Sequence, residues 1–211
     1  MLVHYTLIKV MPERVPQAAE LLAGSRLIEY FLKAHGLRHG SLSECVDEPG
    51  KLFSLSMWDS LADAHAVFAD PNYSVLISEI RSLLIAAPVR IGYNLLETQV
   101  NRPLVTNQAL FIHNTILTVA PENTPRLLST LYSPKTIALS AAFPGFYMSY
   151  AFEALEAPGQ IISMSWWDSV ADAQATFAHP EYAALLDDLQ AYLIRPPERQ
   201  GYKLLKIVRH K

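Results

Sequence analysis

The sequence holds few of the residues on which several common kinds of site depend. Cys45 is its only cysteine, so we expect neither an internal disulfide nor a thiolate-bound metal cluster. Only 8 of the 211 residues are glycine, and no Gly-rich phosphate loop, dinucleotide-binding fingerprint or nucleophile elbow is present. These absences argue against the nucleotide-dependent enzymes and the hydrolases that carry those motifs.

Charge and long apolar runs are also scarce. The formal net charge is −3 and there is no basic run, which argues against nucleic acid or a membrane surface as a partner. No apolar run approaches the roughly 20 residues that a membrane-spanning helix needs, and residues 1–5 do not resemble the start of a signal peptide. We therefore expect a soluble cytoplasmic protein. Its apolar content of 51% is enough for a substantial core.

The chain does contain a long internal repeat. Residues 58–73 read WDSLADAHAVFADPNY, and residues 167–182 read WDSVADAQATFAHPEY. The same offset of 109 positions holds without a gap along both halves, with roughly a third of the paired positions identical. Since 109 residues is the length of a small domain, the sequence predicts two copies of one domain, at 1–102 and 110–211, with a linker at 103–109.

Each copy has the same predicted order of elements. Runs rich in β-branched and aromatic residues indicate strands, and apolar residues at helical spacing indicate helices between them. The strands expected in the first copy are residues 2–10, 37–46, 52–58 and 92–100. One helical region precedes the second strand and another follows the third, so the order is the ferredoxin-like β-α-β-β-α-β.

The predicted strands carry apolar residues on both faces. Helices can cover only one face of a ferredoxin-like sheet, so the other face needs a second partner. The sequence therefore predicts an α+β fold in which two tandem ferredoxin-like domains pack sheet to sheet as a pseudo-dimeric α+β barrel. The pseudo-dimer would be intramolecular, and a further homodimer through exposed edge strands stays open.

Three motifs shared by both copies resemble a known family. The Trp that ends the third strand, the Asp-Ser-x-Ala-Asp-Ala after it and the later Pro-x-Tyr are similar to the antibiotic biosynthesis monooxygenase (ABM) domain. That domain belongs to the dimeric α+β barrel superfamily, and this chain resembles the tandem-duplicated form. The resemblance covers both copies nearly end to end, although its motifs mostly describe the fold.

The resemblance implies an oxidoreductase function. Members of the family include monooxygenases that need no cofactor and act on small aromatic or polyketide-like compounds, so the expected partner is a small apolar or aromatic molecule. Other members have no known activity. Whether this protein is an enzyme therefore stays open, and the alternative is a non-catalytic protein of the same barrel fold that binds a small ligand or assists assembly.

Haem binding or degradation is the less favoured reading of the same resemblance. Nine residues after the strand-ending Trp, many relatives have a His and the haem-degrading members have a Trp, whereas this chain has Val67 and Thr176. The helix that follows also lacks the His that the haem-degrading members carry, so the usual imidazole ligand of the iron is missing. No other His or carboxylate spacing indicates a metal site.

Asn114 is the first candidate catalytic residue. It stands where haem-degrading and some oxygenase members have a functional Asn, and the first copy has Tyr5 there. An amide that faces a pocket could bind a substrate oxygen or dioxygen. Ordinary hydrogen bonding near a pocket mouth is the alternative.

His4, His113 and Arg199 are the other catalytic candidates. His4 and His113 share one strand position, and an imidazole there could be a general base. Because neighbouring strand residues alternate, they face away from Tyr5 and Asn114 and would lie in the sheet–sheet interface. Arg199 precedes the last strand, where it could pair with an anionic substrate or enolate or be an ordinary charge at a helix–strand junction. The residues expected to line pockets are Tyr5, Trp58, Trp167, Tyr73, Tyr182, Val67 and Thr176. For the two tryptophans and for Tyr73, packing in the core is the alternative.

Overall fold

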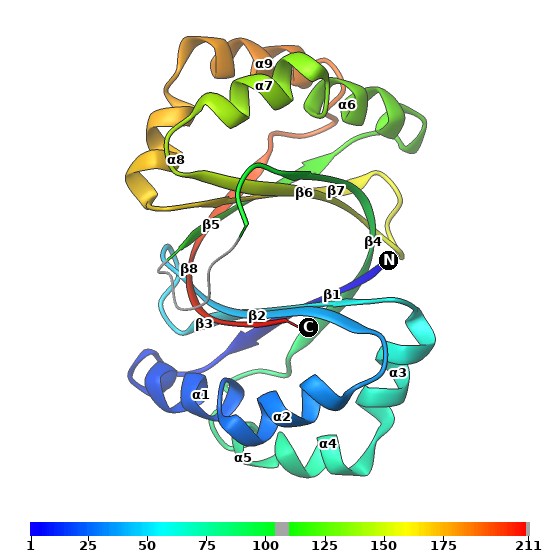
Figure 1. Ribbon diagram of the computed structural model, residues 1–211, viewed down its shortest axis with the longest axis vertical. Coiled ribbons are helices and arrows are strands. Elements are labelled where there is room, and N and C mark those ends of the chain that lie inside the picture. The colour runs from blue at the N-terminus through cyan, green and yellow to red at the C-terminus, as the bar shows by residue number, and fades with distance from the viewer. Residues whose placement is uncertain (104–109, 210–211) are drawn as a thin grey trace. The chain divides into compact units, whose positions relative to one another are not determined.

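The structure is a computed structural model that describes residues 1–103 and 110–209, with only the backbone of Arg209 (Figure 1). The expected linker therefore lies outside the described residues, apart from Pro103. The elements of the first copy are β1 (Leu2–Lys9), η1 (Pro12–Arg14), α1 (Val15–Leu22), α2 (Ser25–Lys33), β2 (Leu37–Cys45), β3 (Lys51–Trp58), α3 (Leu61–Ala69), α4 (Pro71–Leu76), α5 (Ser78–Arg81) and β4 (Val89–Val100).

The second copy repeats this order. Its elements are β5 (Phe111–Thr118), η2 (Pro121–Asn123), α6 (Thr124–Leu131), α7 (Pro134–Ala142), β6 (Phe146–Ala154), β7 (Gln160–Trp167), α8 (Val170–Phe177), α9 (Pro180–Gln190) and β8 (Glu198–Arg209). The predicted α+β class and the tandem ferredoxin-like order are thus confirmed. No helix in the ranges 1–103 and 110–209 is long and apolar enough to cross a membrane.

The chain forms two compact units whose limits differ from those of the sequence copies. One unit is Met1–Tyr93 with Tyr202–Lys211, and the other is Asn94–Gly201. Strands β4 and β8 are therefore each divided, and most of β8 belongs to the first unit. The division of the sequence at 1–102 and 110–211 stays a prediction about the repeat.

Each unit has an antiparallel sheet with helices on one side (Figure 1). The first sheet has the order β1-β3-β2-β8 and the second has the order β5-β7-β6-β4. Strand β8 reaches the first sheet by pairing with β2, where Leu42 lies opposite Lys206. This pairing brings side chains from the end of the chain to a sheet that the first copy builds.

The strand-ending tryptophans anchor each sheet to the helices that follow. Trp58 lies opposite Leu2 in β1 and opposite Leu37 in β2. All three side chains are buried, and they belong to one apolar cluster with residues of α3. Trp167 occupies the same place in the second unit, against Phe146.

Local chemistry fixes where the helices after these tryptophans begin. The Ser60 hydroxyl accepts a hydrogen bond from the Asp63 backbone N–H at 3.1 Å, and Ser169 does the same for Asp172. A serine in this place satisfies a backbone donor that the first helical turn leaves unpaired. Gly36, just before β2, lies against the Asp63 side chain, so that an added Cβ would clash with it. Its φ of +74° is also a left-handed conformation that residues with a side chain rarely adopt.

Candidate functional site

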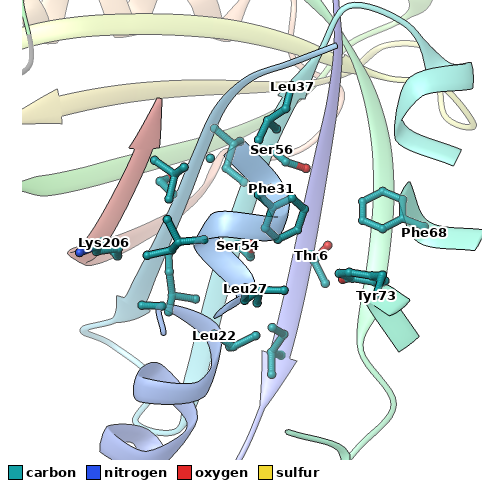
Figure 2. A pocket seen from close by; sticks show the side chains of 18 of the residues that line it. Thr6, Leu22, Leu27, Phe31, Leu37, Ser54, Ser56, Phe68, Tyr73 and Lys206 are labelled. Carbon is teal, nitrogen blue, oxygen red and sulfur yellow. The ribbon is translucent and has the colours of Figure 1, made fainter. Parts of the chain in front are cut away.

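The first unit contains a cavity between its sheet and its helices (Figure 2). Its volume is about 90 Å³, counted as the space open to the centres of water molecules. The strands supply hydroxyl groups to its floor, from Thr6 in β1 and from Ser54 and Ser56 in β3. Apolar and aromatic side chains of α2, α3 and α4 form its walls, and those labelled in Figure 2 are Leu27, Phe31, Phe68 and Tyr73.

Two cationic side chains, Arg90 and Lys206, also line this cavity, and both lie at exposed positions. The guanidinium carbon of Arg90 lies 3.8 Å from the centre of the Phe68 ring, within the range of a cation–π contact. Its Nε donates a hydrogen bond to Oγ1 of Thr6 at 3.4 Å. No Asp or Glu is among the lining residues in the described part of the chain, so the electrostatic field at this cavity favours an anion.

The Tyr73 hydroxyl belongs to the same group. Burial raises its pKa above the ordinary value of 10.0, and the nearby Arg90 acts in the opposite direction. The phenol is therefore protonated at neutral pH, when it can donate a hydrogen bond to a ligand oxygen. Of the residues that the sequence suggested for a pocket, Tyr73 is the one that lies in the lining of this cavity.

His4 lies next to this cavity, on the helix-covered face of the sheet. Its ring is 5.1 Å from the ring of Phe68 and 6.5 Å from that of His65, both on α3. The expectation that the histidines lie in a sheet–sheet interface was therefore wrong. Neighbouring residues of β1 do face opposite sides of the sheet, but the helices cover the face of His4 and not the face of Tyr5.

His4 is 7% exposed, and neither ring nitrogen has a hydrogen-bond partner among the described residues. Burial lowers its pKa from 6.5 to about 4, and the charges of Arg90 and His65 act in the same direction. The imidazole is therefore neutral at pH 7 and could accept a proton.

Tyr5 and Asn114 lie away from the cavities. The Tyr5 ring stacks on Phe53 at 4.2 Å, and its hydroxyl lies 3.1 Å from that of Tyr202. Asn114 is 1% exposed and stands opposite Met164 in β7. Neither residue belongs to the lining of the cavity in its unit.

The second unit has a cavity at the matching place, with a volume of about 40 Å³. His113 lines it directly, and the Thr115 hydroxyl lies 3.4 Å from Nδ1 of His113. Arg199 is not among the residues that line it, and its guanidinium carbon lies 5.9 Å from the centre of the Phe177 ring. The remaining candidates that line this cavity are Trp167 and Tyr182.

Trp58, Val67 and Thr176 are buried side chains behind the cavities. Trp58 is fully buried, and its Nε1 donates to the Ser56 hydroxyl at 2.9 Å. Val67 belongs to the same apolar cluster as Trp58. The Thr176 hydroxyl donates to the Asp172 carbonyl at 3.1 Å. Trp58 thus orients a lining hydroxyl, while Val67 and Thr176 fill the contact between sheet and helix.

Sequence reasoning singled out few of the residues that line the first cavity, and Phe31 and Lys206 show two reasons why. Phe31 was one apolar position in a helical pattern, with no sign that it would meet Trp58 and Tyr73. Lys206 lies in the last strand of the second copy and reaches this cavity only because β8 pairs with β2. The repeat did mark Lys206 as unusual, because the equivalent position in the first copy has the opposite charge, Glu97.

Comparisons with solved structures identify the fold. No protein-family model and no curated protein sequence matches the chain. An "anthrone oxidase-like protein" superposes with a TM-score of 0.72 and 16% identity, covering 99% of this chain and 92% of that one. A "Putative monooxygenase" from Fusobacterium nucleatum superposes with a TM-score of 0.78 and 8% identity, covering 99% of this chain and 94% of that one. A putative monooxygenase from Lactobacillus acidophilus superposes with a TM-score of 0.72 and 7% identity, covering 99% of this chain and 95% of that one. The chain therefore has the same fold as these three proteins.

Proposed function

We propose that the protein is a cofactor-independent monooxygenase that binds a small aromatic or polyketide-like compound in the first cavity. The observation that carries this proposal is the Arg90 guanidinium, held over Phe68 at the exposed rim of a cavity walled by aromatic and aliphatic side chains. Apolar walls with a few polar groups are typical of small-molecule sites. A cation at the rim suits a phenolate or enolate.

The size of the cavity limits what can enter. An apolar cavity of about 150 Å³ holds a benzene molecule, so about 90 Å³ encloses only part of one ring, and the remainder of the ring would lie at the exposed rim. The rest of a larger aromatic compound would extend past Arg90 and Lys206. The ring inside would lie between the hydroxyl-lined floor and the walls of Phe31 and Tyr73.

The proposed chemistry uses electrons from the substrate itself. His4, without a hydrogen-bond partner among the described residues, would accept the proton of a phenol or of an activated methylene group. Because its lowered pKa makes it a weak base, this transfer depends on stabilisation of the anion that forms. Arg90 and Tyr73 would stabilise the resulting anion. For a methylene between two aromatic rings, reaction with dioxygen then converts CH₂ to a ketone and releases one water. Both oxygen atoms and all electrons are accounted for without a reductant.

Oxygen uptake with anthrone and with a dihydroxynaphthalene tests this function. We expect uptake with the freshly purified chain, and a larger loss of rate in Arg90→Gln than in the repeat-matched Arg199→Gln. The reverse order would move the reaction to the second copy. No uptake across such a panel, from protein with native circular dichroism, would sink the proposal.

The second candidate function is a non-catalytic protein that shelters a small ligand. It is favoured by Val67 and Thr176, which fill the helix position where many relatives have a His. Native mass spectrometry would then find a retained ligand that dioxygen leaves unchanged. A Soret band on haem titration would instead support the haem reading.

A further inference from the structure

The two cavities differ at one pair of repeat-equivalent positions on the helix side. Ala23 follows the last residue of α1 and lines the first cavity, and Tyr132 follows α6 in the same way and lines the second. Both are the C-cap residues of their helices, so the backbone delivers them to matching places. The first cavity thus has a methyl group, from Ala23, where the second cavity has the phenol of Tyr132.

A second pair of repeat-equivalent positions, on a strand, also has the smaller residue in the first copy. Gly40 of β2 lines the first cavity, and Ser149 of β6 lines the second. The backbone does not require a glycine at position 40. A Cβ added to Gly40 would meet only Val208 Cβ at 3.8 Å and the Leu55 carbonyl oxygen at 3.9 Å, which are ordinary contacts. The effect of this glycine is therefore to leave space in the first cavity.

Tyr132 occupies the corresponding space in the second unit. Its ring packs against the apolar cluster that contains Leu127 and Leu189, and its hydroxyl oxygen is buried. Burial raises the pKa of this hydroxyl, while the Ser149 hydroxyl acts in the opposite direction and Tyr182 adds to the rise. Tyr132 lines the second cavity together with Ser149 of β6 and Tyr182 of α9. The volume left there is about 40 Å³, against about 90 Å³ in the first unit.

We infer that Tyr132 is a plug that closes the second cavity, so that the chain binds one aromatic ligand and not two. This inference rests on the proposed function for its premise that the first cavity binds such a ligand. Tyr132 and Ser149 determine which copy binds, and Ala23 and Gly40 are the matching small residues that keep the first cavity open. The duplicated chain has therefore kept one binding cavity and filled the other.

Binding stoichiometry of the full chain tests the inference, with 2-naphthol as the probe in isothermal titration calorimetry. We expect one site in the wild type and one more in the double variant Tyr132→Ala, Ser149→Gly. Chemical shifts of the His113 imidazole should respond to 2-naphthol in the variant only. The reverse change, Ala23→Tyr, should remove the wild-type site while leaving the circular dichroism native, which covers the case of a double variant that fails to fold.

The outcomes separate this inference from the proposed function. A folded double variant with no added site would overturn the plug, and so would a wild type that already binds two molecules. A wild type that binds none while the double variant binds one would support Tyr132 as a plug of the second cavity, but it would contradict the proposed function and overturn the inference that the wild type binds one ligand.

Discussion

The Nε of Arg90 donates a hydrogen bond to Oγ1 of Thr6 across 3.4 Å, and this contact separates the chemistry of the two copies. In the second copy the equivalent hydroxyl, on Thr115, lies 3.4 Å from Nδ1 of His113. In the first copy the Thr6 hydroxyl accepts a hydrogen bond from Arg90, and His4 has no hydrogen-bond partner among the described residues. The two copies thus differ in the hydrogen bonding of this threonine and of the histidine two positions before it.

The first prediction concerns the charge of Arg90. Replacing it in Arg90→Gln should raise the pKa of His4 from about 4 toward 6.5, because the guanidinium charge disfavours a second cation nearby. The pKa should not reach 6.5, since burial is the larger cause of the shift. NMR titration of the imidazole measures it. Arg199→Gln, in the other unit, is the control and should leave His4 unchanged, whereas an unmoved pKa in Arg90→Gln would contradict the prediction.

The second prediction is that His4 makes stability depend on pH. The folded pKa of about 4 lies below the unfolded value of 6.5, so between these pH values the unfolded chain binds a proton that the folded chain does not. The free energy of unfolding should be highest above pH 6.5 and should fall as the pH drops toward 4. The contribution is at most about 3 kcal/mol, from 1.36 kcal/mol per pKa unit.

Urea unfolding at pH 7 and at pH 4.5 measures this dependence. The variant His4→Asn has no titrating group at the position, so its two unfolding free energies should lie closer together. An equal drop in the variant and the wild type would assign the pH dependence to other groups.

Much of the fold could be predicted because its signals are local. Each strand and helix carries its own periodicity, and the repeat supplied a second copy of every element to compare. The face of the sheet that the helices cover could not be predicted in this way. Tyr5 is 4% exposed and His4 is 7% exposed, and two buried faces give no sign of which one meets a helix.

The candidate site was less predictable because its residues come together only through long-range pairing. Lys206 lies opposite Leu42 in the register of β2 and β8, more than 160 positions apart in the sequence. The open cavity also depends on what is small, at Ala23 and Gly40. Nothing in the sequence marks these small residues as important. Their role becomes clear only when the structure shows that the larger residues Tyr132 and Ser149 line the second cavity at the equivalent positions.

The third prediction concerns the start of α3. Ser60→Ala should lower the free energy of unfolding by about 1 kcal/mol, because the Asp63 backbone N–H loses its acceptor. The same change should raise the pKa of the Asp63 carboxyl, since the hydrogen bond from the Ser60 hydroxyl is the main cause that lowers it. Urea unfolding and a carboxyl NMR titration test the two effects. Ser60→Thr keeps the hydroxyl and should preserve most of both, and a threonine variant as weak as the alanine variant would argue against the cap.

The fourth prediction concerns the aromatic wall of the first cavity. The ring of Phe31 lies 6.4 Å from that of Trp58 and 5.9 Å from that of Tyr73, and such pairs are worth about 0.5–1.5 kcal/mol beyond the area that they bury. Phe31→Leu keeps an apolar side chain but removes these ring contacts, so it should lower the free energy of unfolding by about 1 kcal/mol. It should also weaken 2-naphthol binding, because the bound ring loses an aromatic neighbour. Phe31→Tyr retains the ring and is the matched control. Equal affinities in the leucine and tyrosine variants would mean that the wall acts through its volume alone, and the aromatic character proposed for the ligand would lose this support.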